Sequence, residues 1–412
     1  MRLLHTSDWH LGQSLHNFER SYEHQRFLDW LLDTIVHEQA DALLIAGDIF
    51  DNANPSSASQ KQLYRFLQQA RERVPHLNLI VIAGNHDSPG RLEAPGPLLE
   101  AHGTRVVGNV QRLADGNIDI ASMVLPLTGR TGAVEAWCLA VPFLRPGDVP
   151  RMQAEGDVNT GADPYLAGIA LLYRQALELA LSKRQDGQAI LAMGHCHMVD
   201  GQMSNDSERR IVIGGTEMLP AGIFDPAIAY AALGHLHLAQ TVGKQQHIRY
   251  CGSPIPLSFA EVSYQHQILR IDLEGGAVRE VAPLFVPRAV DLLRIPSKPA
   301  ALEQVLEELA ALDVPPAPTD QQPFLEVRVR LDAPEPGLRS RIEAALEGKP
   351  VRLAKIETSS AARSTSIDSE VMTLDQLEQL KPDDIFKQLY QQRFGNDAPA
   401  EQLTAFAELM LP

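Results

Sequence analysis

Five short polar clusters in this chain each follow an apolar run of the kind that forms a strand. They read DWH, GD, GNHD, GH and GHLH, in that order, at residues 8–10, 47–48, 84–87, 194–195 and 234–237. Each supplies carboxylate, amide or imidazole groups, which are ligands that divalent metal ions accept. One such cluster alone would carry little information. Five of them at strand ends predict a shared two-metal site for hydrolysis.

Two divalent ions roughly 3.5–4 Å apart supply what phosphodiester hydrolysis needs, because they stabilise the attacking and the leaving oxygen together. A ligand shared by both ions has to offer an oxygen to each, which makes the carboxylate of Asp48 the natural bridge. Asp8 and His10 are two residues apart and can turn toward the same ion. His235 and His237 can likewise project one side chain to each ion. The candidate ligands are Asp8, His10, Asp48, Asn85, His195, His235 and His237.

One strand end carries two histidines, because His197 follows His195 by two residues. Either side chain could be the ligand at this position. His195 is preceded by a glycine, as His235 is, and this parallel favours His195.

The elements that must position these clusters alternate between strand and helix signals over the first third of the chain. Residues 42–46 and 79–83 are continuous apolar runs that end in glycine, as expected for strands buried on both faces. Residues 21–38 and 57–73 carry apolar side chains at helical spacing. This alternation predicts the α/β class.

Composition divides the chain into three predicted parts. Residues 1–284 carry the five clusters and form the predicted catalytic domain. Residues 285–358 are predicted to form a small α/β module, in the order strand, helix, Pro-rich linker, strand, helix and strand. Residues 359–412 begin with a tether rich in Ser, Ala and Thr, followed by two amphipathic helices. The aromatic faces of these helices favour docking to a partner over folding back on the catalytic domain.

Basic side chains in the small module have two interpretations. Arg328 and Arg330 lie on the polar side of a strand that alternates over residues 325–331. They could form a track for a DNA backbone, or belong to a solvated surface of mixed charge, and the interspersed glutamates favour neither interpretation. His16, in the loop after the first cluster, is a further candidate for contact with a phosphate.

The net charge of −16 comes from 52 acidic and 36 basic residues and by itself argues against a polyanionic substrate. Bound divalent metals, or a basic partner, would reverse the local sign of the field. Three widely spaced cysteines without a CxxC pair indicate a reducing compartment. No apolar stretch approaches the roughly 18–20 residues of a membrane span, and the N-terminus lacks a signal-peptide pattern. A cytoplasmic protein is therefore expected.

The ordered set DxH, GD, GNHD, GH and GHxH resembles the pattern of the calcineurin-like metallophosphoesterases. More narrowly, residues 4–12 and 47–51 are similar to the signature of the SbcD family, the nuclease component of bacterial SbcCD exonucleases. The resemblance covers nearly the whole chain, including a capping module and a helical tail. Asp51 stands where the archaeal and eukaryotic repair nucleases often carry histidine, which favours the bacterial branch.

The resemblance implies a two-sheet sandwich flanked by helices, with two metal ions bound. Manganese is the usual metal of the family, although oxygen and imidazole ligands also accept Mg²⁺ or another divalent cation. His86 matches the residue that assists the leaving group, and Asp87 would orient it. By analogy, the ligand sets are Asp8, His10, Asp48 and His237 for one ion, and Asp48, Asn85, His195 and His235 for the other.

The resemblance also implies the substrate and the partners. The chain would be a DNA nuclease subunit, a 3′-to-5′ exonuclease on double strands and an endonuclease on single strands, in repair, recombination and hairpin processing. A GxxxxGK[ST] loop is absent, so any ATP dependence has to come from another chain. The family supplies SbcC, a coiled-coil ATPase expected to bind the C-terminal helices, with a homodimer of this chain inside a heterotetramer.

The sequence leaves two rival functions open. The first is a small-substrate phosphatase or cyclic-nucleotide phosphodiesterase on the same metal core. The capping module and the tail argue against it, because a small substrate needs neither. The second is a metal-free scaffold on the same fold, which is disfavoured because every ligand position holds a residue able to bind metal.

Overall fold

The computed structural model describes residues 1–150, 163–199, 201–203, 218–331, 333 and 335–359, together with tail residues 386–387, 390–391, 399 and 402–403. Contacts divide the chain into one unit of residues 1–330 and 334–358, and a second unit of residues 331–333 and 359–412. The first unit holds all three of the larger sheets. Apart from the few tail residues just given, the predicted tether and tail helices lie outside the described residues.

Six strands form the first sheet, in the order β14-β13-β1-β4-β5-β6. Strands β1, β4, β5 and β6 run parallel, whereas β13 and β14 are added in antiparallel fashion. The bounds are Arg2–Thr6 for β1, Ala42–Ala46 for β4, Asn78–Ile82 for β5, Thr104–Val107 for β6, Gln267–Glu274 for β13 and Ala277–Phe285 for β14.

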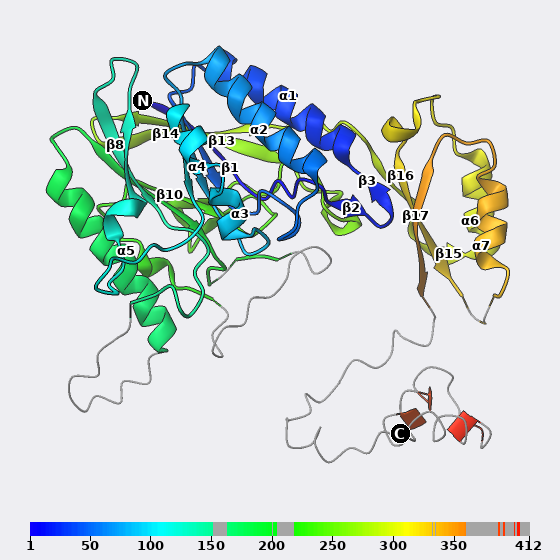
Figure 1. The fold of residues 1–412 in the computed structure, drawn as a ribbon. Coiled ribbons are helices and arrows are strands. Elements are labelled where there is room, and N and C mark those ends of the chain that lie inside the picture. The colour runs from blue at the N-terminus through cyan, green and yellow to red at the C-terminus, as the bar shows by residue number, and fades with distance from the viewer. Residues whose placement is uncertain are drawn as a thin grey trace. The chain divides into compact units, whose positions relative to one another are not determined.

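Helices α1 (Ser21–His37) and α2 (Ser57–Arg73) cover one face of the first sheet (Figure 1). Successive side chains of a strand point to opposite faces, so alternate residues of β4 enter different cores. Leu43 and Ile45 join the apolar cluster that contains α1 and α2, whereas Leu44 joins the cluster shared with the second sheet. All of β4 is buried, as predicted for a strand covered on both faces.

The second sheet has the order β11-β12-β10-β9-β8-β7. Its inner strands β8, β9, β10 and β12 run parallel, and the edge strands β7 and β11 are antiparallel. Helix α5 (Pro164–Lys183) packs against β7, β8 and β9. The strand bounds are Val124–Thr128 for β7, Val134–Ala140 for β8, Ala189–His195 for β9, Tyr230–Gly234 for β10, Gln240–Val242 for β11 and Gln245–Tyr250 for β12.

The two sheets pack face to face, with β4 and β5 of the first against β8, β9 and β10 of the second. Leu44 and Ile80 from the first sheet share one apolar core with Leu191 and Leu233 from the second. Helices α1 and α2 lie on one side of the sandwich and α5 on the other (Figure 1). The predicted α/β class and the two-sheet sandwich flanked by helices are thus confirmed.

A third sheet has the order β15-β16-β17, with α6 packed on β15 and β16 and α7 packed on α6. The element order strand, helix, strand, helix, strand agrees with the predicted pattern, whereas the division into three domains stays a prediction. The bounds are Leu292–Ala301 for β15, Leu302–Ala311 for α6, Phe324–Arg330 for β16, Leu338–Ala345 for α7 and Arg352–Ser359 for β17.

The start of β16 packs against the first part of the chain. Phe324 is fully buried in a small apolar cluster with Leu15 and Phe259. The guanidinium carbon of Arg20 lies 5.7 Å from the centre of the Phe324 ring. The third sheet is therefore joined to the sandwich by apolar and cation–π contacts.

Short elements complete the described part of the chain. Strands β2 (Ser14–Leu15) and β3 (Phe18–Glu19) form a two-stranded hairpin. Helices α3 (Pro89–Glu93) and α4 (Gly96–Ala101) are short. All three cysteines are free thiols. Among the described residues, none of the helices has both the length and the apolar character needed to cross a membrane.

Candidate metal centre

The candidate ligands all lie at the carboxyl ends of strands. Because these strands are neighbours within each sheet and the two sheets are stacked, the strand ends converge. The first sheet supplies Asp8, His10, Asp48 and Asn85 from the ends of β1, β4 and β5, and the second supplies His195, His235 and His237 from the ends of β9 and β10.

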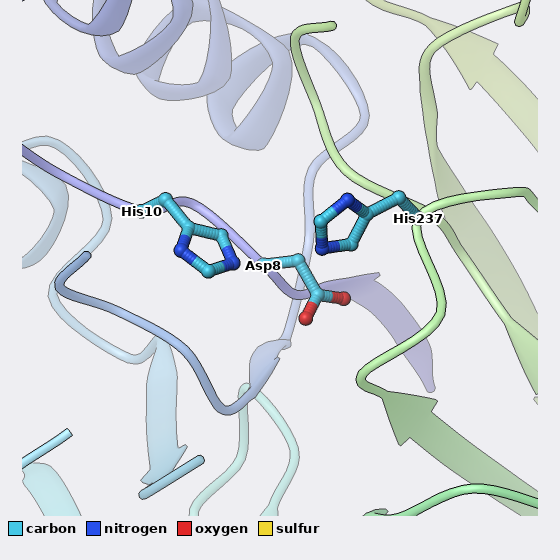
Figure 2. A group of neighbouring side chains, drawn as sticks. All are labelled: Asp8, His10 and His237. Atoms are coloured by element: carbon cyan, nitrogen blue, oxygen red, sulfur yellow. The ribbon is translucent and has the colours of Figure 1, made fainter. Parts of the chain in front are cut away.

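Side chains from both sheets meet in a first group of candidate ligands. Asp8, His10 and His237 present atoms that all lie within 4.8 Å of one another. Figure 2 shows the Asp8 side chain beside both imidazole rings, which come from different segments of the chain. All three side chains are buried. This spacing suits the binding of one cation by three protein ligands.

A second group contains Asp8, Asp48 and His195, again with ligand atoms within 4.8 Å of one another. Nε2 of His195 lies 3.4 Å from Oδ2 of Asp48 and 2.9 Å from Oδ1 of Asn85. The same amide oxygen lies 3.2 Å from Nδ1 of His235. The second predicted ligand set is therefore also brought together.

Asp48 stands between the two predicted ligand sets. Its Oδ2 lies 3.5 Å from Nε2 of His10 and 3.4 Å from Nε2 of His195. A carboxylate oxygen in contact with one imidazole from each set has the position that a bridging ligand requires.

Two observations test whether a divalent cation fits these residues. Nε2 of His10 and Nε2 of His235 are buried without a hydrogen-bond partner among the described residues, which is unusual for buried polar atoms. Asp8, Asp48 and His235 have φ angles of 55°, 50° and 106°, which non-glycine residues rarely adopt. Such backbone strain concentrates at functional sites. The set fits a divalent cation held by carboxylate, amide and imidazole groups.

Glycines allow the strand ends to approach one another this closely. A Cβ at Gly84 would lie 2.1 Å from Oδ1 of Asp48, and a Cβ at Gly234 would lie 1.9 Å from the carbonyl oxygen of Ala46. A larger residue at either position would displace a candidate ligand or the end of β4. This explains why glycine precedes the ligands in the GNHD and GHLH clusters.

The charges of Asp48 and His195 depend on each other. Burial would raise the pKa of the Asp48 carboxyl, but His195, His10 and His86 around it hold that pKa well below its ordinary value. Burial would lower the pKa of His195, but the charge and hydrogen bond of Asp48 raise it to about 9. At neutral pH the centre therefore keeps a negative charge on Asp48, and a proton on His195 has to leave when a cation binds.

His86 borders the centre and is half-buried. Its backbone N–H donates to Oδ1 of Asp48 at 2.9 Å, and its Nδ1 lies 2.7 Å from the carbonyl oxygen of Asp51. Because a carbonyl only accepts, Nδ1 carries the hydrogen and Nε2 is the nitrogen that can take up or release a proton. A third group of ligand atoms, from His10, Asp48 and His86, lies within 4.8 Å, so the geometry also allows His86 to bind metal.

Asp87 has a different place from the one expected. Its carboxylate accepts the backbone N–H groups of Gly84, Ile49 and Phe50, at 2.8, 3.1 and 2.9 Å. It thereby ties the loop after β4 to the loop after β5. The expectation that Asp87 orients His86 is corrected, because a backbone carbonyl holds the His86 ring instead.

The two histidines of the GHxH cluster differ in their surroundings. His195 lies in the group with Asp48, whereas the ring centre of His197 lies 6.0 Å from that of His235. The choice of His195 as the ligand at this strand end stays a prediction.

The three candidate DNA-contacting residues belong to other parts of the first unit. His16 lies in the turn between β2 and β3, where its surface is exposed. Partial shielding from water by neighbouring groups, together with the nearby charge of Lys355, lowers its pKa. Nε of Arg328 donates to Glu357 at 2.9 Å, so its charge is paired. Arg330 is exposed at the end of β16.

Two carboxylates that the sequence analysis did not place at the metal centre lie beside candidate ligands. Oε1 of Glu261 is 2.9 Å from Nδ1 of His237, and Oδ1 of Asp51 is 3.4 Å from Nδ1 of His10. Asp51 lies shortly after the GD cluster, so the sequence contained a signal for its place near the metal centre. Glu261 lies outside every motif.

Comparisons with known proteins agree with this geometry. A family model described as calcineurin-like phosphoesterase matches residues 1–239, and one described as Type 5 capsule protein repressor C-terminal domain matches residues 288–394. A relative from Rhodobacter capsulatus, the SbcD component of the nuclease SbcCD, is 39% identical over 86% of this chain and 86% of its own. The chain belongs to the SbcD family of calcineurin-like phosphoesterases.

Further SbcD relatives come from other bacteria. The Escherichia coli K12 protein is 34% identical over 94% of this chain and 92% of its own, and the Bacillus subtilis protein is 34% identical over 67% of each. Membership in the SbcD family makes this chain a metal-dependent hydrolase of a nuclease family. The converging carboxylate, amide and imidazole groups are the residues available to hold divalent metal.

Proposed function

We propose that this SbcD-family chain is a nuclease subunit that hydrolyses DNA phosphodiester bonds with two bound divalent cations, in the first place Mn²⁺. The proposal is carried by the position of Asp48, because its Oδ2 lies within 3.5 Å of a histidine nitrogen from each ligand set. The proposed sets are Asp8, His10, Asp48 and His237 for one ion, and Asp48, Asn85, His195 and His235 for the other.

When bound, the two cations neutralise phosphoryl oxygens and help to activate water. The protein contributes the geometry and one proton carrier. His86 is the proposed catalytic residue, because its Nδ1 is fixed on the Asp51 carbonyl and its Nε2 can hold a proton for the departing sugar oxygen. Asp87 keeps the loop that carries His86 in place through its three backbone hydrogen bonds.

The names of the relatives support the choice of substrate and partner. We propose 3′-to-5′ exonuclease activity on double strands and endonuclease activity on single strands, in DNA repair, recombination and hairpin processing. An SbcC-type coiled-coil ATPase would bind residues 359–412, and two copies of this chain would form the centre of the complex. In the proposed division, residues 1–284 are the nuclease domain and residues 285–358 the capping module.

Substitution of the bridging carboxylate tests the proposal. Asp48→Asn keeps the size of the side chain but replaces one oxygen by an amide nitrogen, which cannot bind a cation. We expect cleavage of linear duplex DNA, with Mn²⁺ and the ATPase partner present, to fall at least about 100-fold. Asp115→Asn is the matched control, because Asp115 is an exposed carboxylate in a turn, and it should retain full activity.

The same assay includes a chromogenic phosphodiester to separate the rival functions. Cleavage of the small ester alone, with the partner supplied, would refute the DNA nuclease and favour the rival function, a small-substrate phosphatase or cyclic-nucleotide phosphodiesterase. Fewer than two Mn²⁺ per wild-type chain after dialysis, with neither substrate cleaved, would refute the two-metal centre itself.

A further inference from the structure

A buried carboxylate outside every sequence motif contacts one of the candidate ligands. Glu261 ends a short 3₁₀ turn, Phe259–Glu261, and its side chain is fully buried. Its Oε1 lies 2.9 Å from Nδ1 of His237. A carboxylate accepts hydrogen bonds but donates none, so Nδ1 of His237 carries the hydrogen and Nε2 has a lone pair for a metal.

Glu261 is itself held on its other side. Its Oε2 accepts the backbone N–H of Leu257 at 2.8 Å and lies 3.4 Å from Oγ of Ser253. The backbone N–H of Ser253 in turn donates to the carbonyl oxygen of His237 at 3.1 Å. The carboxylate therefore has a fixed position relative to both the side chain and the backbone of His237.

Other histidines of the centre show the same arrangement of their two nitrogens. Nδ1 of His195 lies 2.9 Å from the carbonyl oxygen of Ala46, and Nδ1 of His10 lies 3.4 Å from a carboxylate oxygen of Asp51. In each case a protein acceptor faces Nδ1, which leaves Nε2 as the nitrogen that could bind a metal. Two of these three histidines face a carboxylate, and the contact of His237 is shorter than that of His10. An imidazole whose Nδ1–H faces a charged carboxylate is a stronger metal ligand than one whose Nδ1–H faces a neutral carbonyl.

We propose that Glu261 is a positioning residue that fixes Nε2 of His237 as the metal-binding atom and strengthens binding of the ion beside Asp8. The inference rests on the proposed ligand role of His237. A hydrogen-bond partner of a metal-binding histidine typically raises the metal affinity by about 10- to 100-fold. Removing the charge of Glu261 should therefore weaken one of the two metal sites and leave the other.

Glu261→Gln is a sharp test because an amide offers only one accepting oxygen. If that oxygen accepts from Leu257, the NH₂ group faces Nδ1 of His237 and the ring hydrogen moves to Nε2, which then cannot bind a cation. If the oxygen accepts from His237 instead, the NH₂ group opposes the N–H of Leu257. Both arrangements lower the affinity of the same ion.

The experiment is a titration of the full-length chain with MnCl₂. Binding is measured by calorimetry and by the electron paramagnetic resonance signal of unbound Mn²⁺. We expect two ions for the wild type, and for Glu261→Gln one ion of wild-type affinity and one weakened about 10- to 100-fold. Glu274→Gln, which alters an exposed glutamate, is the matched control and should bind both ions normally. Wild-type affinity for both ions in Glu261→Gln would overturn the inference while leaving the two-metal proposal intact.

A double substitution separates positioning from a general effect on folding. If Glu261 acts through His237, then adding Glu261→Gln to His237→Asn should weaken Mn²⁺ binding no further. A further loss of the same size in both backgrounds would mean that Glu261 only supports the fold, and would overturn the inference. A wild-type chain that binds fewer than two ions would instead count against the proposed function.

Discussion

Asp48 connects the candidate metal centre to His86, the proposed catalytic residue, through its two oxygens. Oδ2 faces His10 and His195, and Oδ1 accepts the backbone N–H of His86. The Asp48 carboxylate therefore fixes how far the two ligand sets lie from the start of the loop that carries His86. Its left-handed φ of 50° shows that the chain bends sharply to place it there.

Replacing His86 distinguishes a proton carrier from a metal ligand. We expect His86→Ala to bind two Mn²⁺ with affinities within about threefold of wild type, and to lose about 10²- to 10⁴-fold in DNA cleavage, the usual range for general acid catalysis. Metal titration and a nuclease assay on the same preparation measure both quantities. His102→Ala removes an exposed histidine and should change neither. Loss of one ion in His86→Ala would instead make His86 a ligand, which the group with His10 and Asp48 allows.

Metal affinity should depend on pH through His195. The neighbouring Asp48 raises the pKa of this imidazole to about 9 although burial opposes it, so the metal-free ring is protonated below that pH. A cation has to displace the proton, and each unit of pH below about 9 should weaken binding up to about tenfold. Calorimetry at pH 6.5, 7.5 and 8.5, in buffers of different ionisation enthalpy, measures the affinity and the proton released. The same Mn²⁺ affinity at all three pH values would contradict this coupling.

At the scale of elements, the strand ends were predictable because each combines a signal for position with a signal for chemistry. An apolar run ending in glycine marks the carboxyl end of a buried strand, as at β4 and β5. Polar residues that follow such runs must lie at one edge of the sheet once the strands are parallel neighbours. Fold class and the convergence of the ligands could therefore be predicted from the sequence.

The partners of these ligands could not be predicted in the same way. Glu261 is 24 residues from His237 and follows an irregular segment, so neither periodicity nor spacing connects them. Sequence adjacency suggested Asp87 as the residue that orients His86, but the fold brings the backbone of Asp51 to that ring instead. Contacts between separate loops depend on how the loops pack, which local patterns do not encode.

The segment from Ser253 to Glu261 contacts both the metal centre and the third sheet, which belong to different predicted domains. Its last residue contacts the candidate ligand His237, whereas Phe259 packs in the cluster around Phe324 of the third sheet. The carbonyl oxygen of Pro256 also accepts from the Arg20 side chain, which lies over the Phe324 ring. Contacts of the third sheet and the position of a metal ligand therefore depend on the same short loop.

At the scale of the whole molecule, the charge of −16 has to be reconciled with the proposed substrate, DNA, which is a polyanion. Many basic side chains of the third sheet and its helices do not offer unpaired charge to a phosphate backbone, because carboxylates neutralise them. These ion pairs are Arg294–Glu326, Arg328–Glu357, Arg339–Glu343 and Arg341–Glu303. Attraction for DNA should therefore come mainly from bound cations, which reverse the sign of the field at an acidic centre.

DNA binding by the isolated chain should accordingly require metal. The His86→Ala chain is expected to cleave DNA too slowly to degrade it during the measurement. Its binding to a duplex can therefore be measured with Mn²⁺ and with EDTA at about 50–200 mM salt, the range in which phosphate contacts are sensitive to ionic strength. We expect binding only with Mn²⁺. In that state Arg330→Ala, which removes an exposed charge, should lower the slope of affinity against salt by about one. Arg328→Ala should change the slope less, because Glu357 already neutralises Arg328. Equal binding in EDTA would contradict the argument and place the attraction in basic side chains of this chain.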